Sequence, residues 1–162
     1  MAQKPAQGSW VIVLSFFVAF LLAIYPLPLS LQLLRPEWVT LVLIYWVIAL
    51  PQRIGLLVSF GVGLLLDLLE GAALGQNALS LSVVAYLALV LYQRLRVFSM
   101  LQQVGVVFVM VGINQLVSQW VHNLTGEGAQ DLLFLLPAVL SALLWPAILT
   151  LLRRARRQYS VS

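Results

Sequence analysis

The sequence predicts an all-α integral membrane protein, a bundle of six transmembrane helices that forms one domain over residues 1–162. Of the 162 residues, 62% are apolar and only 9% are charged, whereas soluble domains have about 45–50% apolar and about 25% charged residues. The apolar residues form runs that are separated by short stretches holding nearly every charge and most of the prolines. None of these runs alternates like a barrel strand, so helices are the structure that satisfies their backbone in hydrocarbon.

Six apolar runs are read as membrane spans, at about residues 10–24, 36–51, 54–69, 78–92, 101–120 and 132–152. The first ends at the Tyr25-Pro26-Leu27-Pro28 turn, and the second is bounded by Pro36 and Pro51. At 1.5 Å per residue the second run is only about 22 Å long, short of a hydrocarbon core of roughly 30 Å. Its boundaries are therefore the least well defined of the six.

The third run begins after Arg53 and ends before Glu70, and the fourth ends before Arg94. The fifth run ends in polar residues, and the sixth ends at a basic tail, residues 153–162. Arginines in this tail favour contact with anionic lipids of the inner leaflet, at about 1 kcal/mol per basic residue. A membrane anchor is the simpler interpretation of the tail, and a protein-docking segment is the alternative.

The positions of the basic residues predict the orientation. With six spans and the N-terminus inside, only Arg35 falls in an outer segment. The inner segments hold the other eight: Lys4, Arg53, Arg94, Arg96, Arg153, Arg154, Arg156 and Arg157. Because cytoplasmic loops are enriched in Lys and Arg, both termini are predicted to be cytoplasmic. The net charge of +4 thus reflects membrane topology and does not indicate a nucleic-acid partner.

Several classes of chemistry have no support in the sequence. Cysteine is absent and His122 is the single histidine, which leaves no thiol nucleophile, iron–sulfur ligand set or imidazole-based metal site. Neither a phosphate-binding loop nor a nucleophile paired with a base is present. We therefore predict no catalytic residues, no metal and no cofactor, and a protein that is not an enzyme.

Asp67 is the most informative single residue, because a carboxylate inside an apolar run is costly and usually has a buried partner or a function. Glu70 lies on the same helix face, and the helix dipole disfavours both charges there. Arg35, the only outer basic residue, begins the second run beside the outer end of the third, although Glu37 competes for it. We predict a structural role for Asp67, as an ion pair with Arg35 or as a hydrogen bond at a helix end. A proton or cation relay is the alternative.

Two helix faces carry small residues at four-residue spacing, which lets helices approach closely where lipid supplies no hydrophobic drive for association. One face could receive the transmembrane helix of a partner, although such faces also serve packing within a chain. The first face consists of Ser15, Ala19 and Ala23, and the second of Gly55, Ser59 and Gly63.

The fifth run ends with Asn114, Gln115, Ser118, Gln119 and His122. Hydrogen bonds between helices, worth about 0.6 to 2 kcal/mol each, are the usual role of such residues. A ligand cavity is the alternative.

Two segments resemble the bacterial rod shape-determining protein MreD family. The first is Arg35-Pro36-Glu37-Trp38 with the apolar run that follows, and the second is the stretch from Gly63 to Glu70 that continues to Leu79. The resemblance covers nearly the whole chain. The positions that carry it are Pro36, Trp38, Gly63, Asp67, Gly71 and Gly75.

This resemblance implies a multi-pass protein of the bacterial inner membrane that serves as a non-enzymatic scaffold. Members of the family associate with the bitopic protein MreC, and through it with MreB, the glycosyltransferase RodA and the elongation transpeptidase of lateral peptidoglycan synthesis. The family is also similar in fold to the substrate-binding S components of energy-coupling-factor vitamin transporters. In that alternative function, the polar outer ends of the third and fifth helices would line a small-molecule cavity.

Overall fold

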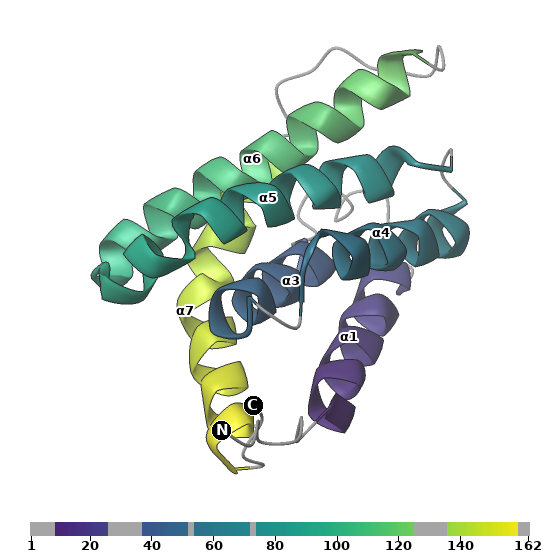
Figure 1. Cartoon of the computed structure of the whole chain (residues 1–162). Coiled ribbons are helices and arrows are strands. Elements are labelled where there is room, and N and C mark those ends of the chain that lie inside the picture. The colour runs from purple at the N-terminus through teal and green to yellow at the C-terminus, as the bar shows by residue number, and fades with distance from the viewer. Residues whose placement is uncertain (1–8, 26–36, 52–53, 72–73, 125–135, 159–162) are drawn as a thin grey trace.

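The computed structural model describes residues 9–25, 37–51, 54–71, 74–124 and 136–158, and all the regular structure in these ranges is helical (Figure 1). The helices are α1 (Ser9–Ile24), α3 (Trp38–Ala49), α4 (Leu56–Glu70), α5 (Gln76–Val97), α6 (Met100–Leu124) and α7 (Leu136–Gln158). Each lies within or around one of the six apolar runs, in the same order. The all-α prediction is confirmed for the described residues.

The helices differ in length. By length and composition, α5, α6 and α7 are long enough and apolar enough to cross a membrane, whereas α1, α3 and α4 are shorter apolar helices. All three long helices extend beyond the predicted runs: α5 reaches Val97, α6 reaches Leu124, and the last turn of α7 contains Arg156 and Arg157. The number of spans and the side on which each terminus lies remain predictions.

Helix α3 forms the centre of the molecule. Every residue from Val39 to Val47 is buried, as expected for a helix that is apolar on all sides. It packs against α1, α5 and α7. Trp46 is fully buried, and its indole N–H donates to the Ser15 hydroxyl at 2.8 Å. The interior between these helices is thus filled by the side chains of α3.

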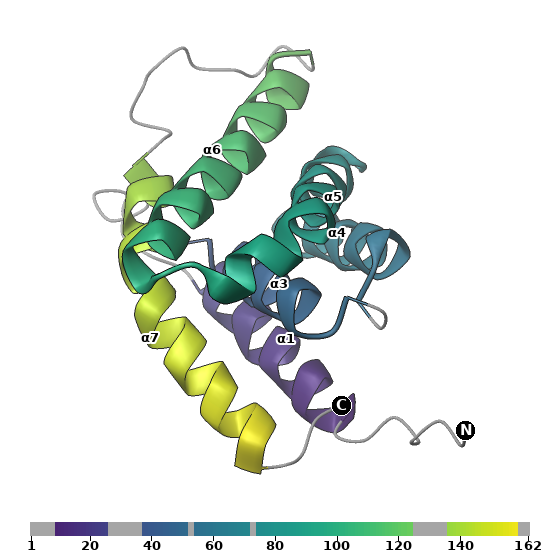
Figure 2. The same ribbon diagram turned by 60° about the vertical axis from the view of Figure 1, so that its left-hand side comes forward.

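The other helices pack around α3 in two directions. Helices α4, α5 and α6 follow one another as packed neighbours, and α1 and α7 run steeply across them (Figures 1 and 2). Helix α6 also contacts α7, so this contact joins the two groups of helices. The bundle is therefore a crossed one, and its helices are not parallel.

Candidate functional site

The junction of α4 and α5 is built around Asp67, which is fully buried three residues before the end of α4. One carboxylate oxygen accepts the backbone N–H of Asn77 at 2.8 Å, and the other accepts that of Gly75 at 2.9 Å. A longer contact of 3.5 Å joins the second oxygen to the N–H of Ala78. These are amides of the first turn of α5 and of the residue before it. Asp67 therefore caps the N-terminus of the next helix.

This cap supplies what α5 lacks. The residue that precedes the helix is Gly75, which offers no side-chain acceptor to the free amides of the first turn. A carboxylate at this position also interacts favourably with the positive end of the α5 dipole. The charge on Asp67 is thus compensated by backbone amides. Arg35 lies outside the described residues, so its ion pair with Asp67 stays a prediction.

Glycines allow the junction to form. Gly71 ends α4 with a φ of +70°, and its N–H donates to the carbonyl of Asp67. Gly75 has a φ of +99°, and positive φ values are costly for residues that have a Cβ. Gly63, one helical turn before Asp67, lies against the start of α5. A Cβ there would stand 2.6 Å from both the nitrogen of Ala78 and the carbonyl oxygen of Asn77.

Four of the six family-resemblance positions therefore have one structural role, since Gly63, Asp67, Gly71 and Gly75 together join α4 to α5. Sequence reasoning found these residues but missed the amides that Asp67 binds. The signal in the sequence is misleading here, because Asn77, a favoured capping residue, directly precedes the predicted run, whereas the structure starts α5 at Gln76 with Gly75 before it. Such a helix start needs an acceptor from elsewhere in the chain.

A second polar cluster joins α3, α6 and α7. The N–H of Glu37 donates to the Ser141 hydroxyl at 2.8 Å, and the Gln115 amide donates to the Glu37 carboxylate. Thr40 donates to the same carboxylate at 3.5 Å and accepts from the Asn114 amide at 3.3 Å. The predicted hydrogen bonds between helices are thus confirmed for Asn114 and Gln115. The side chain of His122 lies outside what the structure describes.

The two small-residue faces have different environments. On α4, the Ser59 hydroxyl is buried and donates to the carbonyl of Gly55 at 2.9 Å, and Gly63 packs on α5. That face is therefore occupied within the chain. On α1, Ala19 and Ala23 are also buried, but this face borders open space as well.

The space is an apolar hollow of about 300 Å³ between α1, α3 and α7. Two members of the small-residue face, Ser15 and Ala19, line it together with Trp38, a family-resemblance position. The remaining lining side chains are apolar: Val11, Leu14, Val18, Leu22, Val42, Ile148, Leu151, Leu152 and Ala155. Pro36, the other family-resemblance position, lies outside the described residues.

Comparison with known proteins assigns the family. The family model of the rod shape-determining protein MreD matches residues 4–155. The chain is also 39% identical over 151 residues to the rod shape-determining protein MreD of Haemophilus influenzae, and the match covers 93% of each chain. The chain belongs to the MreD family. No solved structure matches it, so this assignment rests on sequence.

Membership of the MreD family assigns this chain a role in cell shape and agrees with its apolar helices. At the α4–α5 junction, both carboxylate oxygens of Asp67 accept hydrogen bonds from backbone amides, so this side chain is used to join two helices. In the described part of the chain, no group of three or more His, Asp or Glu residues could hold a metal ion. The junction holds α4 and α5 together.

Proposed function

We propose that this MreD family member is a six-span, non-enzymatic subunit of the bacterial inner membrane that holds the transmembrane helix of MreC in the apolar hollow between α1 and α7. The main support is that Ser15 and Ala19 line the hollow, because both belong to a small-residue face that was predicted to receive a partner's helix. Through MreC, the chain would join MreB, RodA and the elongation transpeptidase, and so support lateral peptidoglycan synthesis.

Packing between helix ends supports the proposed orientation, in which both termini are cytoplasmic. Ala49 at the end of α3, Arg96 near the end of α5, Gln103 near the start of α6 and Arg153 on α7 line one pocket. All four belong to ends that the basic residues predict to be inside. Contacts of Glu37 with Gln115 and Ser141 join helix regions that are predicted to lie toward the outside.

Reporter fusions test this orientation. A reporter after Arg53, Arg96 or Ser162 should be active only in the cytoplasm, and one after Gly75 or Glu127 only in the periplasm. A C-terminal reporter that is active in the periplasm would contradict the six-span proposal and leave the family assignment untouched.

Helix α1 is one of three short apolar helices, and of these it is the one whose small-residue face borders the hollow. Its 16 residues span about 24 Å at 1.5 Å per residue, less than a hydrocarbon core of roughly 30 Å. Association with another helix is one way in which a short span reduces this mismatch. Small residues such as Ser15 and Ala19 permit close approach of the second helix. A single apolar helix is thus a suitable occupant of the hollow.

Filling the hollow tests the proposal directly. Val18 and Leu151 line it and are 46% and 65% exposed, so Val18→Trp and Leu151→Trp add volume there without entering the core. Matched controls are Val13→Trp on α1 and Leu143→Trp on α7, each 67% exposed and absent from the lining. A clash of about 1–3 kcal/mol predicts that co-purification of MreC falls about fivefold or more for the first two variants only.

Equal recovery of MreC with all four variants would place the interface elsewhere on the molecule. The transporter alternative receives no support from the packing. Asp67 is occupied by backbone amides of α5, and Asn114 donates to Thr40. Neither residue lines the hollow between α1 and α7 or the pocket at the arginine end. The scaffold function therefore agrees better with how these polar groups are used.

A further inference from the structure

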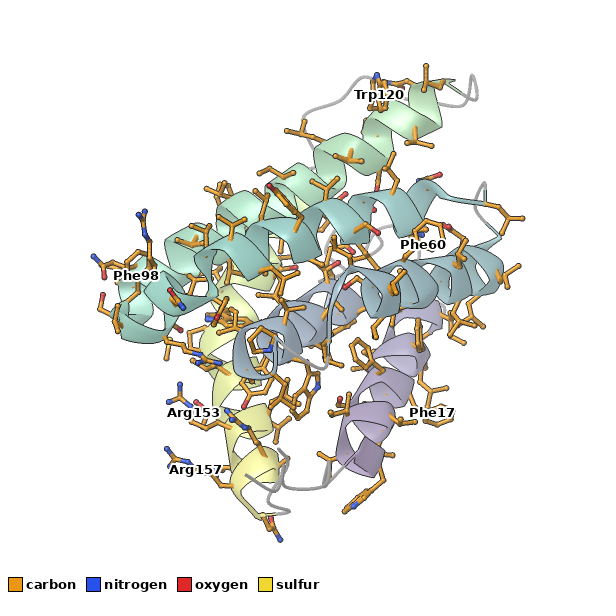
Figure 3. All side chains as sticks on the ribbon, viewed as in Figure 1. Phe17, Phe60, Phe98, Trp120, Arg153 and Arg157 are labelled. Atoms are coloured by element: carbon orange, nitrogen blue, oxygen red, sulfur yellow. The ribbon has the colours of Figure 1, made fainter. Side chains whose placement is uncertain are left out.

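A second pocket, of about 350 Å³, lies where the C-terminal parts of α3, α5 and α7 meet the start of α6. Three arginines line it, Arg96 from α5 and Arg153 and Arg156 from α7, and no carboxylate does. Figure 3 shows Arg153 on the outer side of α7, near the end of α5. The other lining side chains are aromatic, apolar or amide: Tyr45, Ile48, Ala49, Leu95, Gln103, Val107, Trp145 and Leu149.

One of the three arginines is held in place by hydrogen bonds to another helix. The Arg96 guanidinium donates to the carbonyl of Ile48 at 2.7 and 3.1 Å and to that of Ala49 at 3.1 Å, so it closes the C-terminus of α3. Arg156 lines the pocket together with Tyr45 of α3. Side chains that are already oriented lose less conformational entropy when they bind a ligand.

The pocket wall is also fixed by hydrogen bonds. The Gln103 amide donates to the carbonyl of Leu95 at 2.9 Å and accepts from the Trp145 indole at 3.2 Å. This link ties α6 to α5 and α7 at the bottom of the pocket. The cavity is thus a built feature, with rigid apolar walls on one side and guanidinium groups on the other.

The charges at this end have no carboxylate facing them within the pocket. The carboxylates of Glu37 and Asp67 belong to the opposite ends of α3 and α4, where each accepts hydrogen bonds from within the chain. Three like charges around one cavity repel one another. An anion in the pocket would relieve it.

We propose that this pocket binds the phosphate group of an anionic membrane phospholipid. A guanidinium offers paired N–H donors that match phosphate oxygens, and it is weakly hydrated compared with an ammonium group. The apolar side chains Leu95, Val107 and Leu149 would contact the glycerol and the first carbons of the acyl chains. If the proposed orientation is correct, the lipid comes from the inner leaflet, but binding itself requires neither that orientation nor MreC.

Native mass spectrometry of the purified, detergent-solubilised protein tests the proposal, with phosphatidylglycerol added as the probe and phosphatidylcholine as the neutral comparison. The test variant is R153Q/R156Q, which removes two pocket charges and leaves Arg96 of α5 bonded to α3. The matched control is R154Q/R157Q, which removes the same charge from the same turns of α7 at positions that do not line the pocket. We expect phosphatidylglycerol binding to weaken about tenfold in the first variant and less than about twofold in the second.

Equal losses in the two variants would show that lipid follows net charge alone, and would overturn the proposal. A second arm adds inorganic phosphate or glycerol phosphate to the unaltered protein at millimolar concentration. If either compound displaces all of the bound phosphatidylglycerol at concentrations near its own dissociation constant, the pocket is a site for a soluble phosphate. Retention of lipid through this competition is the expected result.

A lysine variant separates loss of lipid binding from misfolding of the R153Q/R156Q variant. R153K/R156K keeps both charges and most of the side-chain length, but an ammonium group cannot form the paired contacts of a guanidinium. The expected loss of phosphatidylglycerol binding is about threefold, between the unaltered protein and the glutamine variant. Binding equal to that of the unaltered protein in both pocket variants would contradict the assignment of these arginines to the site.

Discussion

The two ends of the helical bundle differ in whether their charged side chains are compensated by groups within the chain. At the end predicted to be outside, Asp67 accepts the amides of α5 and Glu37 accepts from Gln115 and Thr40. At the end predicted to be inside, Arg153 and Arg156 line a pocket without a carboxylate. The two carboxylates at the outer end accept hydrogen bonds from within the chain, whereas the two arginines at the inner end line a pocket that an anion could enter.

This difference separates structural from binding roles. A buried carboxylate that already accepts two backbone amides has little capacity left for a ligand, and its loss should reduce stability. A group of arginines without an internal counter-charge costs stability until an anion arrives. The outer end should therefore respond to substitution through folding, and the inner end through lipid binding.

Gly63→Ala should have the largest effect. The added Cβ would meet backbone atoms of Ala78 and Asn77 at 2.6 Å, and backbone cannot move aside as a flexible side chain can. We expect α5 to be displaced from Asp67, with a loss of about 3 kcal/mol or more, and membrane abundance to fall accordingly. Thermal unfolding in detergent and quantitative immunoblotting of membranes are the measurements.

The matched control is Gly61→Ala on the same helix, where a Cβ meets nothing within 4 Å. Because alanine is the better helix former by roughly 0.5–1 kcal/mol, this variant should be unchanged or slightly more stable. Equal stability of the two alanine variants would mean that α4 and α5 are not packed as closely as described.

Asp67→Ala should have the next largest effect, about 2 kcal/mol, because it leaves amides of Gly75 and Asn77 without an acceptor. Asp67→Asn should lose about half as much, since one side-chain oxygen remains to accept. Lipid binding at the inner pocket should be unchanged in both variants. The midpoint of thermal unfolding and phosphatidylglycerol binding by native mass spectrometry provide the two readouts.

A double change of Arg35 and Asp67 to apolar residues separates the cap from the predicted ion pair. If Arg35 pairs with Asp67, loss of either partner alone costs about 3–5 kcal/mol, and the double change restores part of it. If the α5 amides are the only important partners of Asp67, the double change restores nothing, because those amides remain unsatisfied. If Asp67 is instead a proton or cation site, the double change again restores nothing, and the phenotype should respond to external pH.

Much of this molecule was predictable from the order of its residues. The apolar runs predicted six helices in sequence, because each run is long, continuous and bounded by charges or prolines. The same reasoning identified Asp67 and the glycines around it. Its hydrogen bonds with backbone amides of the next helix could not be read from the sequence, because they depend on how α4 packs on α5. The ion pair with Arg35 stays a prediction.

The sequence by itself determined that the chain is apolar and helical, since composition and the length of apolar runs are local properties. It also indicated the family, because motif positions can be read in order along the chain. Only the tertiary structure decided that Arg96 meets Arg153 and Arg156 in one pocket, and that Ser15 borders a hollow while Ser59 is packed inside. Those outcomes depend on which helix faces meet, and apolar helices in lipid lack the polar and apolar sides that would reveal this in advance.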